Sequence, residues 1–155
     1  MRRVLILLSV AAAVVACAKK EEAPPAADTS AAAMAPAAAP AALTDAGISG
    51  TWKGTSSPMT SDSVVSHWTT VCAAGKCTGT STEDKTTIHY TYTLSGGDSA
   101  MGGSEPFAGP KGVKMTDHWT AHIAGDKVNG TGAQKLASKP DSVVLAYKFM
   151  GTRQH

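Results

Sequence analysis

The chain has 155 residues and a formal net charge of +2, and the lysines of residues 43–155 are scattered singly along the sequence. Without a basic cluster the chain lacks the electrostatic footprint of a nucleic-acid-binding protein, so no nucleic-acid partner is predicted. Residues 44–155 have a length that suits one folded domain.

The chain starts with a short basic segment followed by an apolar run. Arg2 and Arg3 precede residues 4–15, in which only Ser9 is polar. A permanent membrane-spanning helix needs about 20 apolar residues, and this run is shorter. The combination is typical of a secretory signal peptide, which we place at residues 1–16.

Cys17 closes the motif Val14-Val15-Ala16-Cys17, which resembles the lipobox of bacterial lipoproteins. The resemblance implies cleavage after Ala16, a diacylglycerol on Cys17 and a further acyl chain on its amine. Several chains are needed, because one acyl chain binds a membrane only reversibly. No aspartate follows Cys17, so the resemblance also implies an outer-membrane lipoprotein facing the periplasm or the cell surface. An ordinary cysteine within the apolar run is the alternative.

Residues 17–43 predict a disordered tether. Alanines alternate with Pro24, Pro25, Pro36 and Pro40, and large apolar side chains are almost lacking. Proline interrupts helices, and a segment with so little to bury cannot form a core. We expect this segment to separate the folded domain from the membrane.

Cys72 and Cys77 are the two cysteines that remain after the predicted cleavage and lipidation. An exported protein meets oxidising conditions, and the intervening Gly75-Lys76 favours a turn, so we predict a disulfide across a hairpin. Closing so short a loop contributes about 2 kcal/mol. A redox-active pair or a metal site is the alternative, but the spacing is not CxxC and no second ligand pair lies nearby.

Alternation of apolar and polar residues predicts an all-β domain. Asp117 interrupts one apolar row, which indicates either a bulge or a polar interior position. In residues 142–152 both rows are partly apolar, which predicts a strand covered on both sides. About eight strands are expected, near residues 50–55, 63–72, 77–82, 86–94, 99–105, 113–124, 127–135 and 142–152.

Short connections indicate an antiparallel up-and-down meander. Gly96-Gly97-Asp98 and Gly125-Asp126 are typical hairpin turns. Gly102 and Gly130 lie inside strands, where glycine predicts a bulge or a sharp bend. Closing the meander into a small barrel would remove its two exposed edges.

The first predicted strand adds a resemblance to this expectation. Gly50-Thr51-Trp52 resembles the Gly-x-Trp opening of lipocalins, and residues 46–52 look like the first strand of avidin-type barrels. The resemblance implies a lipocalin-like (calycin) barrel with Trp52 at its base. The layout is also similar to that of uncharacterised bacterial lipoproteins, which implies a fold and a location, not an activity.

Candidate functional residues are few. His118 and His122 share a strand face but lie about 13 Å apart along it, too far for one metal ion. We expect both to face solvent, and we predict no metal site, no cofactor and no catalytic residue. His67 is likewise predicted to be structural. Aromatic side chains could either fill the barrel or line a cavity for a small apolar ligand; these are Trp52, Trp68, Tyr90, Tyr92 and Trp119.

Three functions follow from this layout. The favoured hypothesis is a non-enzymatic, lipid-anchored barrel that binds a small apolar molecule or a protein partner. The second is a structural or envelope-maintenance lipoprotein with a filled core. The third, a hydrolase or metal enzyme, needs His, Asp and Ser side chains that converge in a cleft. The oligomeric state is not indicated.

Overall fold

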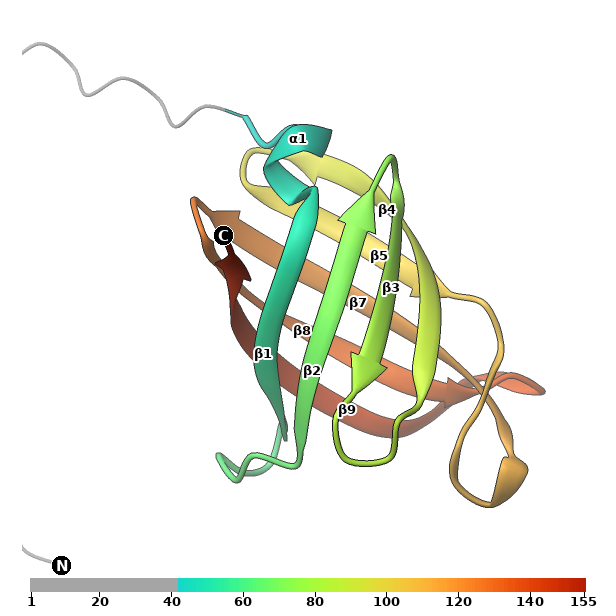
Figure 1. Cartoon of the computed structure of the whole chain (residues 1–155). Coiled ribbons are helices and arrows are strands. Elements are labelled where there is room, and N and C mark those ends of the chain that lie inside the picture. Colours follow the sequence, from blue (N-terminus) through green and yellow to red (C-terminus); the bar gives the residue numbers. More distant parts are fainter. Residues whose placement is uncertain (1–41) are drawn as a thin grey trace, which may run out of the picture. The chain divides into compact units, whose positions relative to one another are not determined.

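The computed structural model describes residues 42–155 (Figure 1). The predicted signal peptide, the predicted lipidation site Cys17 and residues 17–41 of the predicted tether lie outside the described residues. Within residues 42–155, none of the helices has the length and apolar character required to span a membrane.

The domain is all-β, as predicted, with one short helix ahead of the first strand (Figure 1). The strands coincide with the eight predicted segments to within a few residues, and β6 is an additional two-residue strand. In chain order the elements are α1 (Asp45–Ile48), β1 (Gly50–Pro58), β2 (Ser66–Ala73), β3 (Lys76–Ser81), β4 (Thr87–Gly96), β5 (Ser99–Ser104), β6 (Phe107–Ala108), a 3-10 turn (Pro110–Gly112), β7 (Lys114–Ala124), β8 (Lys127–Leu136) and β9 (Lys139–Gln154).

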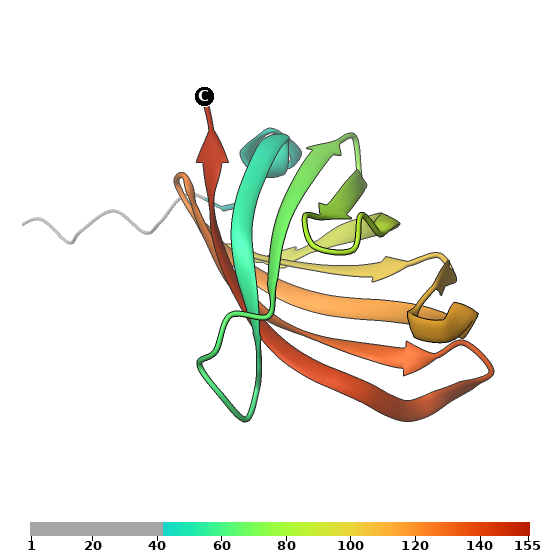
Figure 2. The ribbon, with the colours of Figure 1, turned by 60° about the horizontal axis from the view of Figure 1, so that its bottom comes forward.

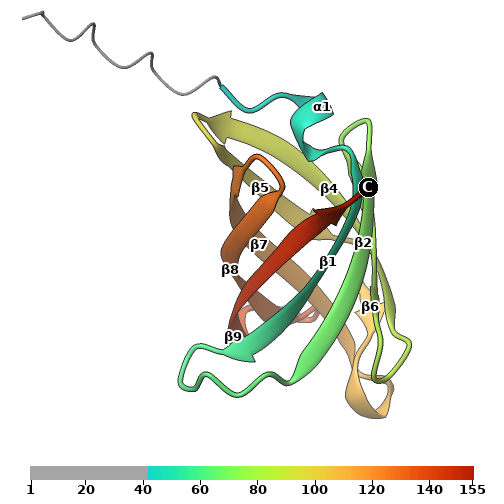
Figure 3. The ribbon, with the colours of Figure 1, turned by 60° about the vertical axis from the view of Figure 1, so that its left-hand side comes forward.

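Eight antiparallel strands close into an up-and-down barrel. Successive strands pair with each other, β5 pairs with β7, and β1 pairs with β9. The β1–β9 register runs from Thr51 opposite Gln154 to Pro58 opposite Tyr147. Figure 3 shows β1 between β2 and β9. Because the first and last strands meet, the meander has no long unpaired edge.

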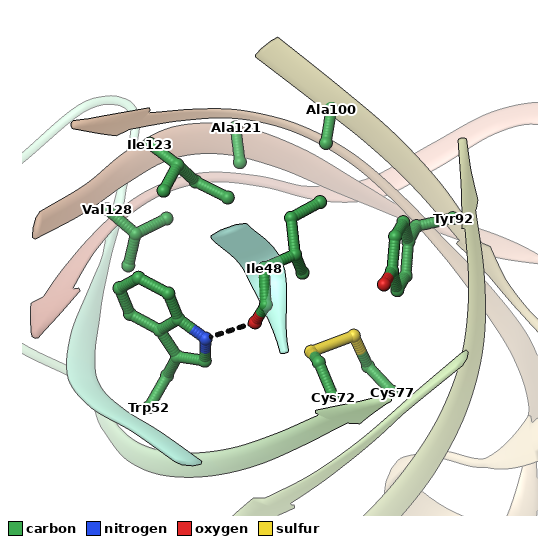
Figure 4. Packing of buried hydrophobic residues seen from close by; sticks show 9 residues of the cluster. All are labelled: Ile48, Trp52, Cys72, Cys77, Tyr92, Ala100, Ala121, Ile123 and Val128. Atoms are coloured by element: carbon green, nitrogen blue, oxygen red, sulfur yellow. Dashed lines mark hydrogen bonds between the residues drawn. A yellow bond between two sulfur atoms is a disulfide. The ribbon is translucent and has the colours of Figure 1, made fainter. Parts of the chain in front are cut away.

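The α1 end of the barrel is closed by α1 together with Ile48 and Trp52, which we call the plug. Thr44 caps the helix, since its hydroxyl accepts a hydrogen bond from the Gly47 amide. Ile48 enters the barrel between Trp52 and Tyr92 (Figure 4), and the Trp52 indole donates a 2.7 Å hydrogen bond to the Ile48 carbonyl. The polar end of the tryptophan is thereby satisfied inside an apolar cluster.

Arg153 holds this plug to the last strand. Its guanidinium lies 4.5 Å above the Trp52 ring and donates to the carbonyls of Ser49 and Gly47. Asp126, in the β7–β8 turn, forms an ion pair with Arg153, with Oδ1 of Asp126 3.2 Å from Nε of Arg153. One side chain therefore joins α1, β1, β9 and a turn that are distant in the sequence.

The Cys72–Cys77 disulfide predicted from the sequence is present. It joins β2 to β3 at directly paired positions, with the two Cα atoms 4.1 Å apart. Both cysteines are buried in the same cluster as Ile48 and Trp52 (Figure 4). The bridge therefore forms part of the interior wall near α1.

Interior aromatic rings lie over glycines on the neighbouring strand. An added Cβ would lie 2.3 Å from a ring carbon at Gly54, Gly102 and Gly132 and 2.5 Å from one at Gly130. A bulge or a sharp bend was predicted at Gly102 and Gly130, and the bulge is absent, because the pairing continues through both positions without a shift. Glycine is needed there because a ring occupies the space of a side chain. The directly opposed pairs are Gly54–Trp68, Gly102–Trp119, Gly130–Phe149 and Gly132–Tyr147.

The prediction that the last strand is covered on both sides is also wrong. Leu145, Tyr147 and Phe149 point into the barrel, whereas Val144 and Met150 are 54% and 63% exposed. A single closed sheet has only one interior face, so the outer row of β9 meets solvent. At Asp117 the β7–β8 register continues unbroken and the side chain is buried, so the polar interior position is confirmed and the bulge is not.

Candidate functional site

A cavity of about 670 Å³ occupies the barrel interior beyond the plug. Ile48 and Trp52 form its floor, and it reaches exposed residues of the 59–65, 82–86 and 105–113 connections, Val65 and Glu83 among them. Figure 2 turns this end of the barrel, opposite α1, toward the viewer. The cavity is therefore closed at the α1 end and meets solvent at the other.

Aromatic rings form much of the cavity wall because each barrel strand turns alternate residues inward. Trp68 and Phe149 pack edge to face with ring centres 6.2 Å apart, and Tyr90 and Trp119 do so at 6.3 Å. Such edge-to-face pairs fix the rings in place. The aromatic lining beyond the floor consists of Trp68, Tyr90, Phe107, Trp119, Tyr147 and Phe149.

Asp117 is a polar group within this apolar wall. Its side chain on β7 is 2% exposed and lines the cavity. The Tyr147 hydroxyl donates to its two carboxylate oxygens at 2.8 and 3.0 Å, and the Tyr90 hydroxyl donates to Oδ2 at 3.2 Å. The Asp117 backbone amide donates to the Ser104 hydroxyl at 2.8 Å. The side chain of Asp117 on β7 thus bonds to β4 and β9, and its backbone amide bonds to β5.

Burial dominates the acid–base behaviour of this cluster. It raises the pKa of Asp117 from 3.8 to about 6, although the hydrogen bonds from Tyr147, Tyr90 and the His118 backbone amide oppose that rise. Burial also raises the pKa of Tyr147 and Tyr90 well above 10, and the neighbouring Asp117 charge adds to the effect. Both tyrosines therefore stay protonated donors, and Asp117 is mostly ionised at neutral pH.

Every charged side chain among the described residues that line the cavity is acidic. Besides Asp117, these are Glu83 and Asp84 in the β3–β4 connection. Glu83 accepts from the His67 backbone amide at 2.9 Å and lies 2.7 Å from His67 Nδ1, and these bonds lower the pKa of Glu83 to about 2. It is therefore ionised at the mouth of the cavity across the physiological pH range.

Four of the five aromatic residues predicted to line a cavity do line it, namely Trp52, Trp68, Tyr90 and Trp119. Tyr92 does not. It is buried against the plug near Ile48, and its hydroxyl donates to the Asp45 carboxylate. Whether the four bind a ligand stays a prediction.

Three residues of the cavity wall, Asp117, Tyr147 and Phe149, were not predicted as site residues from the sequence. Asp117 was expected to mark either a bulge or a polar interior position, but it was not recognised as part of a site. Tyr147 and Phe149 lay in a recognisable alternating row, so their inward orientation was predictable. Nothing in the sequence indicated that Tyr147 and Tyr90 would reach the same carboxylate.

None of the histidines among the described residues lines the cavity. His118 and His122 are on the outer surface, as predicted, and His67 lies at the barrel rim, bonded to Glu83. Within residues 42–155, no three His, Cys, Asp or Glu side chains are grouped so that they could hold a metal ion. The arrangement can thus bind and orient a molecule, and the lining offers it no imidazole base.

No family model matches this chain. No curated protein and no solved structure matches it significantly either. The described residues form a closed eight-stranded antiparallel barrel, consistent with a calycin-like architecture.

Proposed function

We propose that this chain is a lipid-anchored cell-envelope protein whose barrel binds a small, largely apolar molecule without transforming it. One observation carries the binding part of the proposal, namely the aromatic-walled cavity of about 670 Å³. Ligand sites in proteins typically have volumes of roughly 300–1,000 Å³ and apolar walls with a few fixed polar groups.

The distribution of the core supports a hollow barrel over a filled one. An eight-stranded barrel is just wide enough either to be packed with side chains or to hold one small ligand. Here most of the buried cluster, including Ile48, Trp52 and the Cys72–Cys77 bridge, lies at the α1 end. At Gly102, Gly130 and Gly132 a ring occupies the space that a side chain would take, so these rings pack close to the backbone of the barrel wall, and a cavity remains inside. A structural lipoprotein with a filled core would not need this space.

The absence of an enzymatic role is proposed from the lining. The cavity places Asp117 beside two tyrosine hydroxyls, and no histidine or lysine is among the described residues that line it. A hydroxyl nucleophile ordinarily depends on an adjacent base that accepts its proton. Asp117 instead accepts hydrogen bonds from both tyrosines, whose raised pKa values oppose deprotonation.

The membrane anchor is proposed from the Val14–Cys17 motif alone, and it has its own test. The chain expressed in a Gram-negative host and labelled with an alkyne-bearing palmitate should carry the label, and Cys17→Ser should abolish both labelling and sedimentation with membranes. A labelled Cys17→Ser chain, or an unlabelled wild-type chain, would contradict the anchor and leave the barrel unaffected.

Ligand binding can be tested on the whole chain carrying Cys17→Ser, which removes the acyl chains. Titration with N-phenyl-1-naphthylamine, a neutral apolar dye, should give saturable fluorescence enhancement. Thr70→Phe puts a ring into the cavity and should lower the affinity for the dye by about tenfold or more, because the ring takes up cavity space. The matched control is the next residue, Val71→Phe, which is exposed on the outer face. No enhancement, or equal loss in both variants, would refute the proposed function.

A further inference from the structure

Asp117 is buried in the cavity wall without a counter-ion. Its side chain lies among aromatic rings and hydroxyls, and no salt bridge to it occurs among the described residues. Proteins rarely bury a carboxylate without pairing it with a cation, because removing the charge from water costs free energy. Here hydrogen bonds from Tyr147 and Tyr90 offset only part of that cost.

We propose that the barrel cavity binds an organic cation, an aromatic or apolar molecule that carries a protonated amine, with the ammonium group against the Asp117 carboxylate. This inference rests on the proposed function, since it requires a cavity that takes a ligand. It adds the chemical class of the ligand and the residue that selects it.

The carboxylate has capacity left for such a ligand. An ionised carboxylate offers about four acceptor positions, and the Tyr147 hydroxyl, the Tyr90 hydroxyl and the His118 backbone amide occupy about three of them. An ammonium group would donate to a remaining position and form a charge-assisted hydrogen bond, stronger than one between neutral groups. The two tyrosines keep the carboxylate oriented before the ligand arrives, which lowers the cost of ordering it on binding.

The surrounding rings favour a cation over a neutral molecule. Trp119 on β7 packs against Tyr90, and Trp68 lies on β2 with its ring against Phe149. Aromatic faces attract an ammonium group within about 6 Å of the ring centre, and tryptophan does so most strongly. The remaining apolar wall suits the hydrocarbon part of the same molecule.

The mouth of the cavity has the same charge preference. Glu83 and Asp84 lie in the β3–β4 connection and line the end that meets solvent. A cleft lined by charges of one sign raises the local concentration of oppositely charged ligands. An anionic ligand would meet Glu83 and Asp84 at the entrance and Asp117 inside.

Three probes of nearly equal size test the inference on the Cys17→Ser chain. These are 2-(1-naphthyl)ethylamine, 2-(1-naphthyl)ethanol and 1-naphthylacetic acid, titrated at pH 7.5 by calorimetry. We expect the amine to bind about 10- to 100-fold more tightly than the alcohol, because only the amine brings a positive charge to the Asp117 carboxylate. The acid should bind most weakly of the three.

Asp117→Asn should remove the preference. The amide keeps the size of the side chain and an acceptor oxygen for the tyrosines, so the alcohol should bind nearly as before while the amine falls to the affinity of the alcohol. Asp98→Asn is the matched control, because Asp98 is an exposed carboxylate beside His122 on the outside of the barrel. It should leave all three affinities unchanged.

The outcomes separate the inference from the proposed function. If the amine and the alcohol bind equally, or if Asp117→Asn leaves a preference for the amine intact, the cation site is wrong and the ligand-binding barrel stands. If none of the three naphthalene probes and no N-phenyl-1-naphthylamine binds, both are wrong. Tighter binding of the acid than of the amine would overturn the cation site directly.

Discussion

The Tyr147 hydroxyl lies 2.8 Å from Oδ2 and 3.0 Å from Oδ1 of Asp117 and so joins β9 to β7 across the inside of the barrel. These two residues are 30 positions apart in the sequence, and β8 lies between their strands. The bond satisfies the tyrosine and holds the carboxylate, but it brings no positive charge. The cost of burying the Asp117 charge is therefore only partly offset, and that has consequences for stability.

Asp117→Asn should stabilise the unliganded protein at pH 8. The native state raises the Asp117 pKa from 3.8 to about 6, so the folded protein binds this proton more tightly than the unfolded chain does. The contribution of Asp117 to stability is then greatest below pH 4, falls as the pH rises from about 4 to about 6, and is constant above that. Between low and high pH, the contribution of Asp117 to the free energy of unfolding falls by roughly 3 kcal/mol. We expect the free energy of unfolding of Asp117→Asn to exceed that of the wild type by about 1–3 kcal/mol at pH 8.

Urea unfolding of both proteins at pH 4 and pH 8 measures this effect. At pH 4 the wild-type carboxyl is mostly protonated, so the two proteins should have nearly equal free energies of unfolding. Comparison at each pH cancels the titration of the other carboxylates. A variant that is less stable than the wild type at pH 8 would show that Asp117 is a structural tie between strands.

Gly102→Ala should destabilise the barrel far more than Gly103→Ala. A Cβ at Gly102 would lie 2.3 Å from Cζ2 of Trp119, a ring packed in the cavity wall, so the ring must leave its place. At Gly103 the nearest atom is Nδ1 of the exposed His118, at 3.1 Å, and that side chain can move. Displacing a packed side chain costs about 1–3 kcal/mol.

The two neighbouring variants share a strand, a composition change and a gain in chain stiffness, so the difference between their urea midpoints isolates the contact with Trp119. Tryptophan fluorescence should also shift in Gly102→Ala only. Equal midpoints would mean that the ring does not depend on glycine for its position.

The local features of this fold could be read from the sequence, whereas the contacts between distant strands could not. Alternation along residues 86–94 and the glycine turn at Gly125 depend on neighbouring residues, so the strands and their order were predictable. Asp117 was recognisable as either a bulge or a polar interior position, because it interrupts an apolar row. Its partners were not, because β4 and β9 reach it only through the register of the closed barrel.

Tyr92 illustrates the same limit. Period-2 alternation gives the face of a strand on which a residue lies, so Tyr90 and Tyr92 were correctly placed on one face. It does not give the depth of a residue along the barrel. Tyr92 lies one step nearer α1, where Ile48 and Asp45 surround it, and it therefore belongs to the plug and not to the cavity. The four-residue helix was missed because Arg153, from the other end of the domain, helps to hold it.

Arg153→Lys should loosen the plug. Lysine keeps the charge but loses the planar group that stacks on Trp52 and the fork that reaches the Ser49 and Gly47 carbonyls together. The stacking and the charged hydrogen bonds are together worth about 2 kcal/mol. Lys53→Arg, at an exposed position on β1, is the reverse exchange and should have little effect.

Hydrogen exchange provides the readout for the plug. In Arg153→Lys the amide of Ser49, which donates to the Asp45 carbonyl, should exchange faster, because α1 loses its tie to β9. Protection of the β7–β8 ladder should change much less. Unchanged exchange at Ser49 would mean that Ile48 and Trp52 hold the helix without the arginine.

The affinity of the barrel for 2-(1-naphthyl)ethylamine should fall as the pH is lowered through about 6. The amine stays protonated throughout this range, so the change arises in the protein. Asp117 gains its proton near pH 6 and loses the charge that holds the ammonium. The groups that face it are Tyr147 on β9, Tyr90 on β4, Ser104 on β5 and its pairing partner Gln134 on β8, none of which titrates between pH 5 and 8. Glu83, with its pKa lowered to about 2, stays ionised at the mouth.

Between pH 7.5 and pH 5 we expect the affinity of the barrel for the amine to fall about tenfold, because each pH unit below the Asp117 pKa reduces the ionised fraction of Asp117 up to tenfold. The alcohol should bind equally at both values, and Asp117→Asn should make the amine insensitive to pH. If the amine loses affinity equally in Asp117→Asn, a group other than Asp117 controls the cavity.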